Sequence, residues 1–325
     1  MCITFTHSFN LLKLNEKEYL LKFTNGKIDF AFVGLCIFFS ISGYLIAKSA
    51  IVSPSFKNYL WKRFLRIQPM LILVCILSVF ILGPFFTELS TKEYFNKFNT
   101  FAYFRNIMPL FGIQFDLPEV FKNNIAEAGV NGSMWTLIVE ERLYLIVGLL
   151  FLLKEKRQNW FVYFVGLLNS VWLIHIFIFN YKLIEYLNGG HIFYALIFLN
   201  SSCLYLLNFD FKSRKTIIIA GSAFFLFLVQ YFSLSQPIQV VLIPLIVISL
   251  ANVKSITNNL GKYGDFTYGI YIFSFPIQQI LVSLNLINNN PIKLFFFTLA
   301  IVTPMSVLSW HLLEKKILLL KNRIG

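Results

Sequence analysis

The stretch at residues 133–153 reads SMWTLIVEERLYLIVGLLFLL, and it decides the class of protein to which this chain belongs. It is long and apolar enough to cross a bilayer, because a helical span needs about 20 predominantly apolar residues. Its middle nevertheless carries Glu140, Glu141 and Arg142. An ionisable group at the centre of a membrane helix costs about 2.5–3.5 kcal/mol on insertion scales, so such groups usually face a cavity, a partner or a pathway. We therefore expect a membrane protein that handles a polar substrate.

The rest of the chain has the composition of a polytopic helical membrane protein. Its 325 residues are 57% hydrophobic and 13% charged, whereas soluble domains carry about 25% charged residues. We attribute the net charge of +13 to basic loops that set topology, since cytoplasmic loops of membrane proteins hold an excess of Lys and Arg. Composition therefore predicts the lipid bilayer as a partner and argues against nucleic acid.

Nine apolar segments are long enough to be transmembrane helices, at about 28–50, 67–86, 133–153, 160–179, 191–209, 216–234, 237–253, 266–287 and 292–313. A tenth, at 1–12, reaches only about 18 Å, which is too short for a bilayer core of about 30 Å. We expect it to be re-entrant or to be the remainder of a truncated first helix. The predicted fold is all-α, a bundle of about ten transmembrane helices in a single domain over residues 1–325.

Loop charges predict an orientation for this bundle. The cations concentrate in alternate loops and in the C-terminal tail, so the positive-inside rule places both termini in the cytoplasm. The bias toward Phe, Asn, Lys and Ile suggests a bacterium, and hence its cytoplasmic (inner) membrane. The long loop at 87–132 should lie outside. Its aromatic residues and prolines fit either an interfacial cap over a cavity or a passive linker.

Histidine is the first candidate for chemistry. His7 lies near the end of the short first segment, and an imidazole that titrates near neutrality can take a proton from a hydroxyl. A structural role is the alternative for a lone histidine, and His175, His191 and His311 are further candidates. The four cysteines lie in or beside apolar segments without CxxC spacing, which favours buried hydrophobic roles and predicts no metal site.

A basic cluster precedes the second long span. Arg63 and Arg66 are three residues apart, so both project from one face of a helix, and Lys62 lies beside them. Arginine binds phosphate bidentately, so the cluster suits a phosphate group as well as a role in topology. In the span before it, the small polar residues of FFSISGY at 38–44, Ser42 among them, favour close helix packing.

Aromatic residues accompany the charged triplet and a later span. Trp135 and Tyr144 flank the triplet, and Glu140 shares a helix face with Tyr144 because they are four residues apart. A pairing of Glu140 with another helix is the structural alternative. Tyr268 and Tyr271 are three apart in a span that continues with Ser274 and Pro276. A proline kink in such a span opens a cavity in a membrane bundle.

Taken in order, these pieces resemble the acyltransferase-3 family of integral membrane acyltransferases. The matching motifs are His7, FFSISGYLI at 38–46, RFLRIQP at 63–69, GSMWTLIVEERLYL at 132–145, TYGIYI at 267–272 with Pro276, and Ser309 with Glu314. They extend over residues 7–314, and the helix at 135–144 is the most specific. Two motifs depart from the family pattern: Ser274 replaces a common histidine, and Glu314-Lys315-Lys316 replaces an E-x-P ending. The arginine that often lies eleven residues before the histidine has no counterpart.

The resemblance implies a ten-helix core that moves an acyl group, usually acetyl, from cytoplasmic acyl-CoA to a hydroxyl. The acceptor is typically a sugar of a capsule, O-antigen or exopolysaccharide, free or lipid-linked. His7 would be general base or transient acyl carrier, Glu140 would orient it or a donor group, and Arg63, Arg66 and Lys62 would hold CoA phosphates. Acetyl-CoA would be a co-substrate, with no cofactor permanently bound. Supporting residues of the cavity would be Ser42, Trp135, Glu141, Tyr144, Tyr268, Tyr271, Ser274 and Glu314.

Two other functions fit the same sequence. An intramembrane Glu140 and a kinked span at Pro276 also suit a pathway, as in a polysaccharide transporter or flippase. A polymerase or ligase of the same polysaccharide is the second alternative. The three functions can be distinguished by the polysaccharide that results. Only the acyltransferase changes its acyl content.

Overall fold

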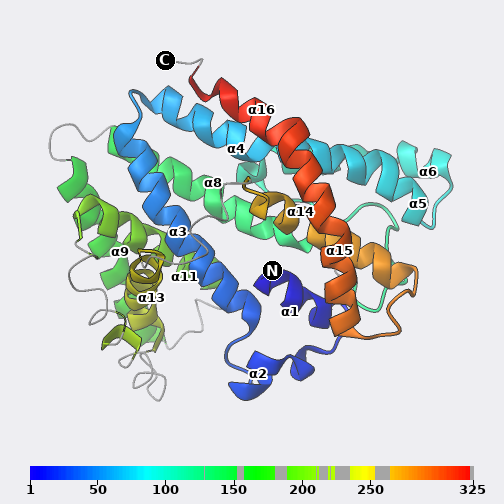
Figure 1. Ribbon diagram of the computed structural model, residues 1–325, viewed down its shortest axis with the longest axis horizontal. Helices are drawn as coiled ribbons and strands as arrows, with labels where there is room; N and C mark the ends of the chain where they lie inside the picture. The colour runs from blue at the N-terminus through cyan, green and yellow to red at the C-terminus, as the bar shows by residue number, and fades with distance from the viewer. Residues whose placement is uncertain are drawn as a thin grey trace. The chain divides into compact units, whose positions relative to one another are not determined.

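The computed structural model describes residues 1–127, 129–151, 157–179, 189–209, 235–252 and 264–322, with residues 211, 219 and 221–223 between them. Over this part of the chain every regular element is a helix, and a lone bridge between Thr87 and Val120 is the only extended pairing (Figure 1). The all-α prediction is therefore confirmed. The span predicted at 216–234 lies almost wholly outside the described residues.

The long helices are α3 (Phe30–Val52), α4 (Phe56–Leu77), α8 (Trp135–Gly148), α9 (Arg157–Phe179), α11 (Gly189–Leu206), α13 (Ser235–Ala251), α14 (Thr267–Ser283) and α15 (Pro291–Ser309). The short α-helices are α1 (Cys2–Asn10), α2 (Tyr19–Phe23), α5 (Gly83–Phe86), α6 (Thr91–Asn96), α7 (Phe98–Ala102) and α16 (Lys315–Leu318). Two π-helical turns, η2 (Ser78–Leu82) and η8 (Trp310–Glu314), continue α4 and α15. The 3₁₀ turns are η1 (Asn15–Lys17), η3 (Tyr103–Ile107), η4 (Pro109–Phe111), η5 (Gly132–Met134), η6 (Leu149–Phe151) and η9 (Leu319–Asn322).

Four helical stretches are long and apolar enough to cross a membrane, at Phe30–Val52, Phe56–Phe86, Gln158–Ile176 and Pro291–Lys321. They coincide with four of the predicted spans. Two further apolar helices, Gly190–Leu206 and Pro237–Ala251, are shorter, and α14 has 17 residues. The larger number of about ten spans remains a prediction.

The chain divides into two compact units. Unit 1 comprises Met1–Gly34, Trp61–Glu141 and Asn259–Ile324, and unit 2 principally comprises Leu35–Leu60 and Arg142–Asn258. The division falls within α3, α4 and α8, so each of these helices contributes residues to both units. A single functional domain over residues 1–325 remains a prediction.

Unit 2 is held together by close contacts between helices. A Cβ on Gly43 would lie 2.1 Å from the carbonyl oxygen of Phe198, so α3 and α11 approach each other at a glycine. Ser201 Oγ donates to the carbonyl of Ser40 at 2.5 Å, and Ser202 Oγ donates to that of Gly43 at 3.0 Å. Small residues at such crossings let backbones approach, which is the packing that the FFSISGY sequence predicts. Helix α11 also packs against α9 and α13.

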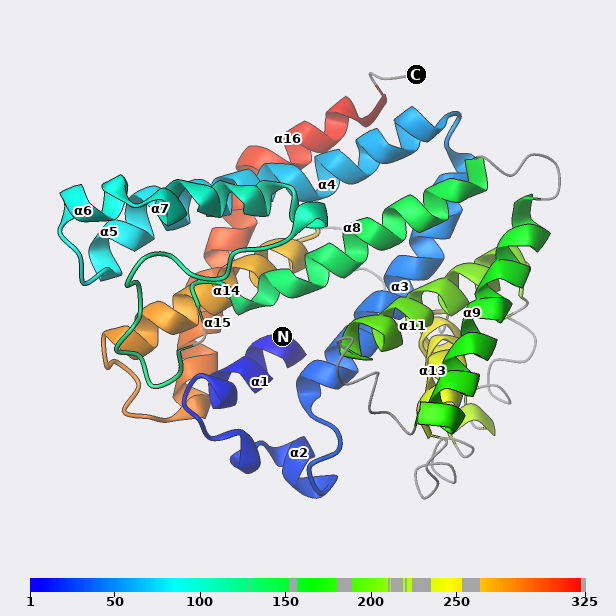
Figure 2. The same ribbon diagram turned by 180° about the vertical axis from the view of Figure 1, so that it is seen from behind.

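Unit 1 is organised around α14. This helix packs along α15, where a Cβ on Gly269 would lie 2.9 Å from Ser306 Cβ. It also contacts α1 and η5, and Figure 2 shows α1 and α15 beside it. Pro276 lies inside α14 and Pro304 inside α15. The central helix of the unit is therefore the one that carries Tyr268, Tyr271 and Ser274.

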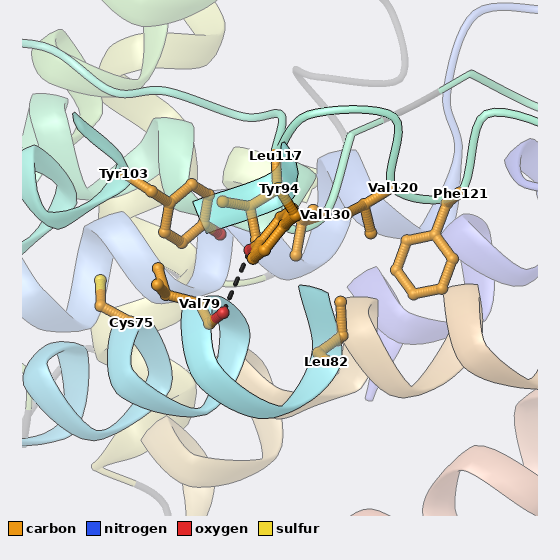
Figure 3. Packing of buried hydrophobic residues seen from close by; sticks show 9 residues of the cluster. All are labelled: Cys75, Val79, Leu82, Tyr94, Tyr103, Leu117, Val120, Phe121 and Val130. Carbon is orange, nitrogen blue, oxygen red and sulfur yellow. Dashed lines mark hydrogen bonds between the residues drawn. The ribbon is translucent and has the colours of Figure 1, made fainter. Parts of the chain in front are cut away.

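The segment at 87–131, which we call the outer loop because the loop charges predict it outside, is folded and shares a core with the helix before it. Buried residues of α4, of η2 and of this loop form one cluster, namely Cys75, Val79, Leu82, Tyr94, Tyr103, Leu117, Val120, Phe121 and Val130 (Figure 3). The Tyr94 hydroxyl donates to the carbonyl of Val79 at 3.1 Å. Ser90 and Glu93 form a capping box at the start of α6. The loop is thus a folded segment that packs against the helix before it.

Candidate active site

The candidate site is built along one face of α14. Tyr268, Tyr271 and Phe275 share this face because they are three and four residues apart. The Tyr268 hydroxyl donates to the carbonyl of Ile67 on α4 at 3.2 Å. The Tyr271 hydroxyl donates to the carbonyl of Ser133 at 2.5 Å and lies 2.6 Å from the hydroxyl of Thr136. The two tyrosines therefore join α14 to α4 and to the start of α8.

Helix α1 is fixed to α14 by two matching pairs of polar residues. Thr4 and Ser8 are four apart on α1, and Ser274 and Gln278 are four apart on α14, so each pair lies on one helix face. Thr4 Oγ1 donates to Ser274 Oγ at 3.2 Å. Gln278 Nε2 donates to the Thr4 carbonyl at 2.9 Å and to Ser8 Oγ at 2.7 Å. These bonds set the register of α1 on α14.

His7 is positioned by this register. Its imidazole packs edge-on against the ring of Phe275, with 5.1 Å between ring centroids and 84° between planes. Its Nδ1 is buried, and no described residue forms a hydrogen bond with it. A buried polar atom without a partner costs about 1–3 kcal/mol. The imidazole is thus placed by packing, and Nδ1 is not engaged by any described group.

Glu140 and Glu141 have different surroundings although they are adjacent in sequence. Both are buried, with 7% and 9% exposure. Glu141 Oε1 accepts from Gln68 Nε2 at 2.5 Å, and its Oε2 accepts from the backbone N–H of Leu110 at 2.8 Å. Both glutamates lie within electrostatic reach of the Tyr268 hydroxyl, and Glu140 is also within reach of the Tyr271 hydroxyl. Glu141 is therefore fixed between α4 and η4, and Glu140 is the one of the two that is close to both tyrosines of α14.

A basic group lies at the N-terminal end of α14. Arg66 Nη2 donates to Asp265 Oδ2 at 2.5 Å. Asp265 Oδ1 also accepts from Thr267 Oγ1 at 2.5 Å. Burial alone would raise the pKa of Asp265, but Arg66 and Thr267 outweigh it, so this pKa lies below its usual value. Lys62 and Arg63 are half-buried on the same helix as Arg66, and Arg66 is the member of the basic cluster that the ion pair fixes at this end of α14.

Glu314 lies in the π-turn that ends α15. Ser309 Oγ donates to its Oε1 at 3.1 Å, while its Oε2 is buried without a hydrogen bond from any described residue. The carboxylate is within electrostatic reach of Arg66 and Tyr268. π-turns inside α-helices occur frequently at functional sites. The last sequence motif therefore meets the basic end of α14.

The remaining predicted residues divide between the two units. Trp135 is half-buried at the start of α8 in unit 1. Ser42 is half-buried on α3 in unit 2. Tyr144, also in unit 2, is buried beside Phe198, and its carbonyl accepts from the Tyr59 hydroxyl at 2.9 Å. Unit 1 alone therefore contains His7, Glu140, Glu141 and the basic cluster, together with Tyr268 and Tyr271 of α14.

One residue of the unit 1 polar network, Glu18, had no signal in the sequence. It is buried, and its Oε1 accepts from the N–H of Phe30 at 2.8 Å and from Thr6 Oγ1 at 3.3 Å. Thr6 Oγ1 in turn accepts from the N–H of Ala31 at 2.9 Å. A carboxylate at a helix N-terminus is favourable because free N–H groups and the helix dipole point there. Glu18 and Thr6 therefore tie α1 to the start of α3.

Two further residues were also missed. Asp265 is the partner of Arg66, and a lone acidic residue at the edge of a predicted span was its only signal. Gln278 is fully buried within α14. A glutamine inside a predicted span is itself unusual and could have marked the contact with another helix. Among the described residues, no group of His, Cys, Asp and Glu is arranged to hold a metal ion.

The model of an acyltransferase domain, that of acyltransferase-3, matches residues 1–311 of this chain. The chain belongs to the acyltransferase-3 family. It is 29% identical to an O-acetyl transferase of Shigella phage Sf6 over 301 residues, which cover 88% of this chain and 84% of the relative. It is also 29% identical to the peptidoglycan O-acetyltransferase OatA of Listeria monocytogenes serovar 1/2a over 166 residues, 45% of this chain and 25% of that protein. No solved structure matches.

Membership of the acyltransferase-3 family confirms the resemblance found in the sequence. With its relatives it identifies the chain as an O-acyltransferase. Together with the four apolar helices it also identifies an integral membrane protein. The roles of the individual site residues remain predictions.

Proposed function

We propose that this chain transfers an acetyl group from cytoplasmic acetyl-CoA to a hydroxyl of a cell-surface polysaccharide or of its lipid-linked unit. The family and the O-acetyltransferase relatives support the acetyl group and the oxygen acceptor. The observation that carries the proposal is the arrangement along α14. Arg66 of the basic cluster lies at the N-terminal end of the helix, and an imidazole lies further along it.

The spacing along α14 suits an extended donor. Asp265, the partner of Arg66, precedes Phe275, the partner of His7, by ten residues. At 1.5 Å per residue this is about 15 Å. In the proposal, Arg63 and Arg66, with Lys62, hold the phosphates of the donor at the cytoplasmic end. The thioester then reaches along α14 toward His7.

In the proposed reaction His7 accepts the proton of the acceptor hydroxyl. The hydroxyl oxygen forms a bond to the acetyl carbonyl carbon, and the carbon–sulfur bond of the thioester breaks. The thiolate leaves with the electron pair and takes the proton from the imidazolium, so the products are an acetyl ester and free CoA thiol. In a two-step variant His7 first carries the acetyl group itself. Glu140, between the two ends of α14, orients the donor or the imidazole.

The proposed topology follows from the loop charges. Both termini and the basic cluster lie in the cytoplasm, the outer loop lies on the far side of a bacterial inner membrane, and about ten segments span it. No permanently bound cofactor takes part in this scheme. The donor and acceptor therefore approach the site from opposite sides of the membrane.

The test compares the surface polysaccharide of a deletion strain with that of its complemented strain by NMR. We expect O-acetyl signals to disappear on deletion and to return on complementation, with chain length unchanged. A polysaccharide that stays inside the cell with its acetyl groups intact would favour a flippase. An altered chain length with intact acetylation would favour a polymerase or ligase.

A further inference from the structure

The outer loop carries a groove that is separate from the residues along α14. Its volume is about 700 Å³, and its walls come from Leu89 and residues 97–99, at the start of α7, on one side and from residues 114–119 on the other. The lining side chains that matter here are Lys97, Phe98, Asn99, Gln114, Asp116 and Glu119. The groove therefore combines one aromatic ring with two amides, two carboxylates and an ammonium group.

The chemistry of the groove matches a carbohydrate. Phe98 is 83% exposed, although an aromatic ring is costly to leave in water. The side chains of Asn99 and Asp116 form no hydrogen bond within the described part of the chain, so their donors and acceptors are open to a ligand. A sugar offers both matching surfaces, since its C–H face can cover a ring and its hydroxyls can bond to amide and carboxylate groups.

Hydrogen bonds join the walls of the groove. Buried Asn106 holds the backbone of Gln114 through two hydrogen bonds of 2.8 Å. The Gln114 amide then donates to the carbonyls of Asn99 and Asp116, both at 2.7 Å. One side chain therefore links the two sides, and the cluster in Figure 3 supports the loop from beneath. A site that is preorganised in this way loses little entropy when a ligand binds.

The backbone at the edge of the groove is strained. Glu119 and Phe121 have φ values of +55° and +56°, a region that bulky residues rarely adopt. Buried Val120 and Phe121 hold this turn in the core of the loop, and Glu119 pairs with Lys122. Such conformations persist only where the surrounding structure determines them. The turn that forms one wall is therefore maintained by the fold of the whole loop.

The same loop is connected to the candidate active site. The N–H of Leu110 donates to Glu141 Oε2 at 2.8 Å. Asn131 Nδ2 donates to the carbonyl of Ile272 on α14 at 2.9 Å, and Gln279 Nε2 donates to the carbonyl of Gly129 at 2.7 Å. A ligand held in the groove is thus fixed relative to α8 and α14 within unit 1.

We propose that this groove is a binding subsite for a neutral sugar unit of the acceptor, and this inference rests on the proposed function. The charges favour the acceptor over the donor, because one lysine among the lining residues faces two acidic side chains. A polyphosphate donor would meet repulsion there. Phe98 stacks on the sugar ring, and Asn99 and Asp116 bind its hydroxyls.

The test uses the purified full-length protein in lipid nanodiscs, with acetyl-CoA as donor. The acceptor is host surface polysaccharide from which mild alkali has removed the O-acetyl groups. We expect Phe98→Ala and Asp116→Asn each to raise the acceptor KM about tenfold, which corresponds to about 1.4 kcal/mol. The KM for acetyl-CoA and kcat should stay unchanged, and Phe98→Trp should retain affinity. Phe111→Ala is the matched control, since Phe111 is 75% exposed in the same loop and does not line the groove.

Binding of the same polysaccharide is measured separately by saturation-transfer NMR. An acceptor KM and a bound signal that are both unchanged in Phe98→Ala and Asp116→Asn would overturn the subsite. So would a loss of membrane abundance in Phe98→Ala with unchanged binding, which would make Phe98 a membrane anchor. If the wild type binds polysaccharide but never acetylates it, the proposed function fails while the groove stands, so the two failures are distinguishable.

Discussion

Unit 1 and unit 2 accommodate buried polar groups in different ways. In unit 2 the crossing of α3 and α11 uses small residues, since Gly43 meets Phe198 and Ser201 and Ser202 donate to carbonyls of α3. The crossing of α9 and α11 uses neutral amides, with Asn169 and Asn200 bonded to each other. Unit 1 instead buries the carboxylates of Glu18, Glu140, Glu141 and Glu314. Every Asp and Glu that the structure describes lies in unit 1.

The two ways of burying polar groups differ in their energetic cost, which indicates that the two units have different roles. Serine and glycine contacts let membrane helices approach closely at little cost, whereas a buried carboxylate is costly unless charges or hydrogen bonds compensate it. We therefore expect the reactive groups in the unit that accepts this cost repeatedly, beside a histidine and a basic cluster. Changes in unit 1 should therefore alter turnover, and changes in unit 2 should alter stability.

The largest effect is expected for His7→Ala, which should abolish acetyl transfer because no described side chain can replace the imidazole beside Phe275. His191→Ala, in unit 2, is the control and should retain activity. Transfer is measured per amount of membrane-inserted protein. Retained acetylation in His7→Ala would remove His7 from the mechanism and with it the contrast between the units.

The adjacent residues Glu140 and Glu141 are expected to differ, the first in its effect on turnover and the second in its effect on stability. Glu140→Gln should lower kcat about 100-fold, within the usual range for a group that assists proton transfer, with little change in melting temperature. Glu141→Gln should instead cost about 1–3 kcal/mol of stability, because one of its two accepted hydrogen bonds is lost. Steady-state kinetics and thermal unfolding of both variants give the answer. The same response from both would show that the two positions do not have separate roles.

Gly43→Ala tests the packing of unit 2. The new Cβ would collide with the backbone of Phe198, and we expect a loss of about 1–3 kcal/mol, as for other overpacked sites. Gly166→Ala is the matched control, since nothing lies within 4 Å of a Cβ there. Thermal unfolding in detergent measures both. An unchanged melting temperature for Gly43→Ala would mean that this helix crossing is not tight.

The basic cluster should affect donor binding alone. The double variant Arg63→Ala, Arg66→Ala should raise the KM for acetyl-CoA about tenfold, which is about 1.4 kcal/mol, because phosphate contacts are lost. Lys315→Ala with Lys316→Ala removes two exposed cations of the same unit and serves as the control. An unchanged KM for acetyl-CoA in the double arginine variant would show that the cluster sets topology and does not bind the donor.

Asp265→Asn is expected to have the smallest effect, a modest loss of stability that depends on pH. Because the folded-state pKa of Asp265 lies below its usual value, its ion pair with Arg66 stabilises the protein at neutral pH and loses this contribution as the pH falls through that pKa. The pair is partly exposed, so the loss should be at most about 1 kcal/mol. Melting temperatures of wild type and variant should converge in acid. A constant difference at all pH values would exclude the ion pair as its origin.

The sequence predicted the helical class and the family because both depend on local patterns, such as apolar runs and the motif around Trp135. It could not predict which helices meet. Thr4 and Ser274 are 270 positions apart, and Arg66 and Asp265 are 199 apart, so no local spacing indicates either contact.

Two further features of the site are also set by the fold and not by local sequence. Glu18 looks like a solvated acidic residue between Lys17 and Tyr19, and only the fold brings it to the start of α3. Glu140 and Glu141 form one motif in the sequence, yet consecutive residues of a helix point about 100° apart, so they meet different neighbours.

Photolabelling tests most directly whether the donor binds in unit 1. Membranes that contain the wild-type protein would be irradiated with a photoreactive acyl-CoA, and labelled peptides identified by mass spectrometry. We predict label within residues 61–69, 132–141 or 264–278, and its loss when excess acetyl-CoA competes. Competable label confined to α9, α11 or α13 of unit 2 would contradict the account.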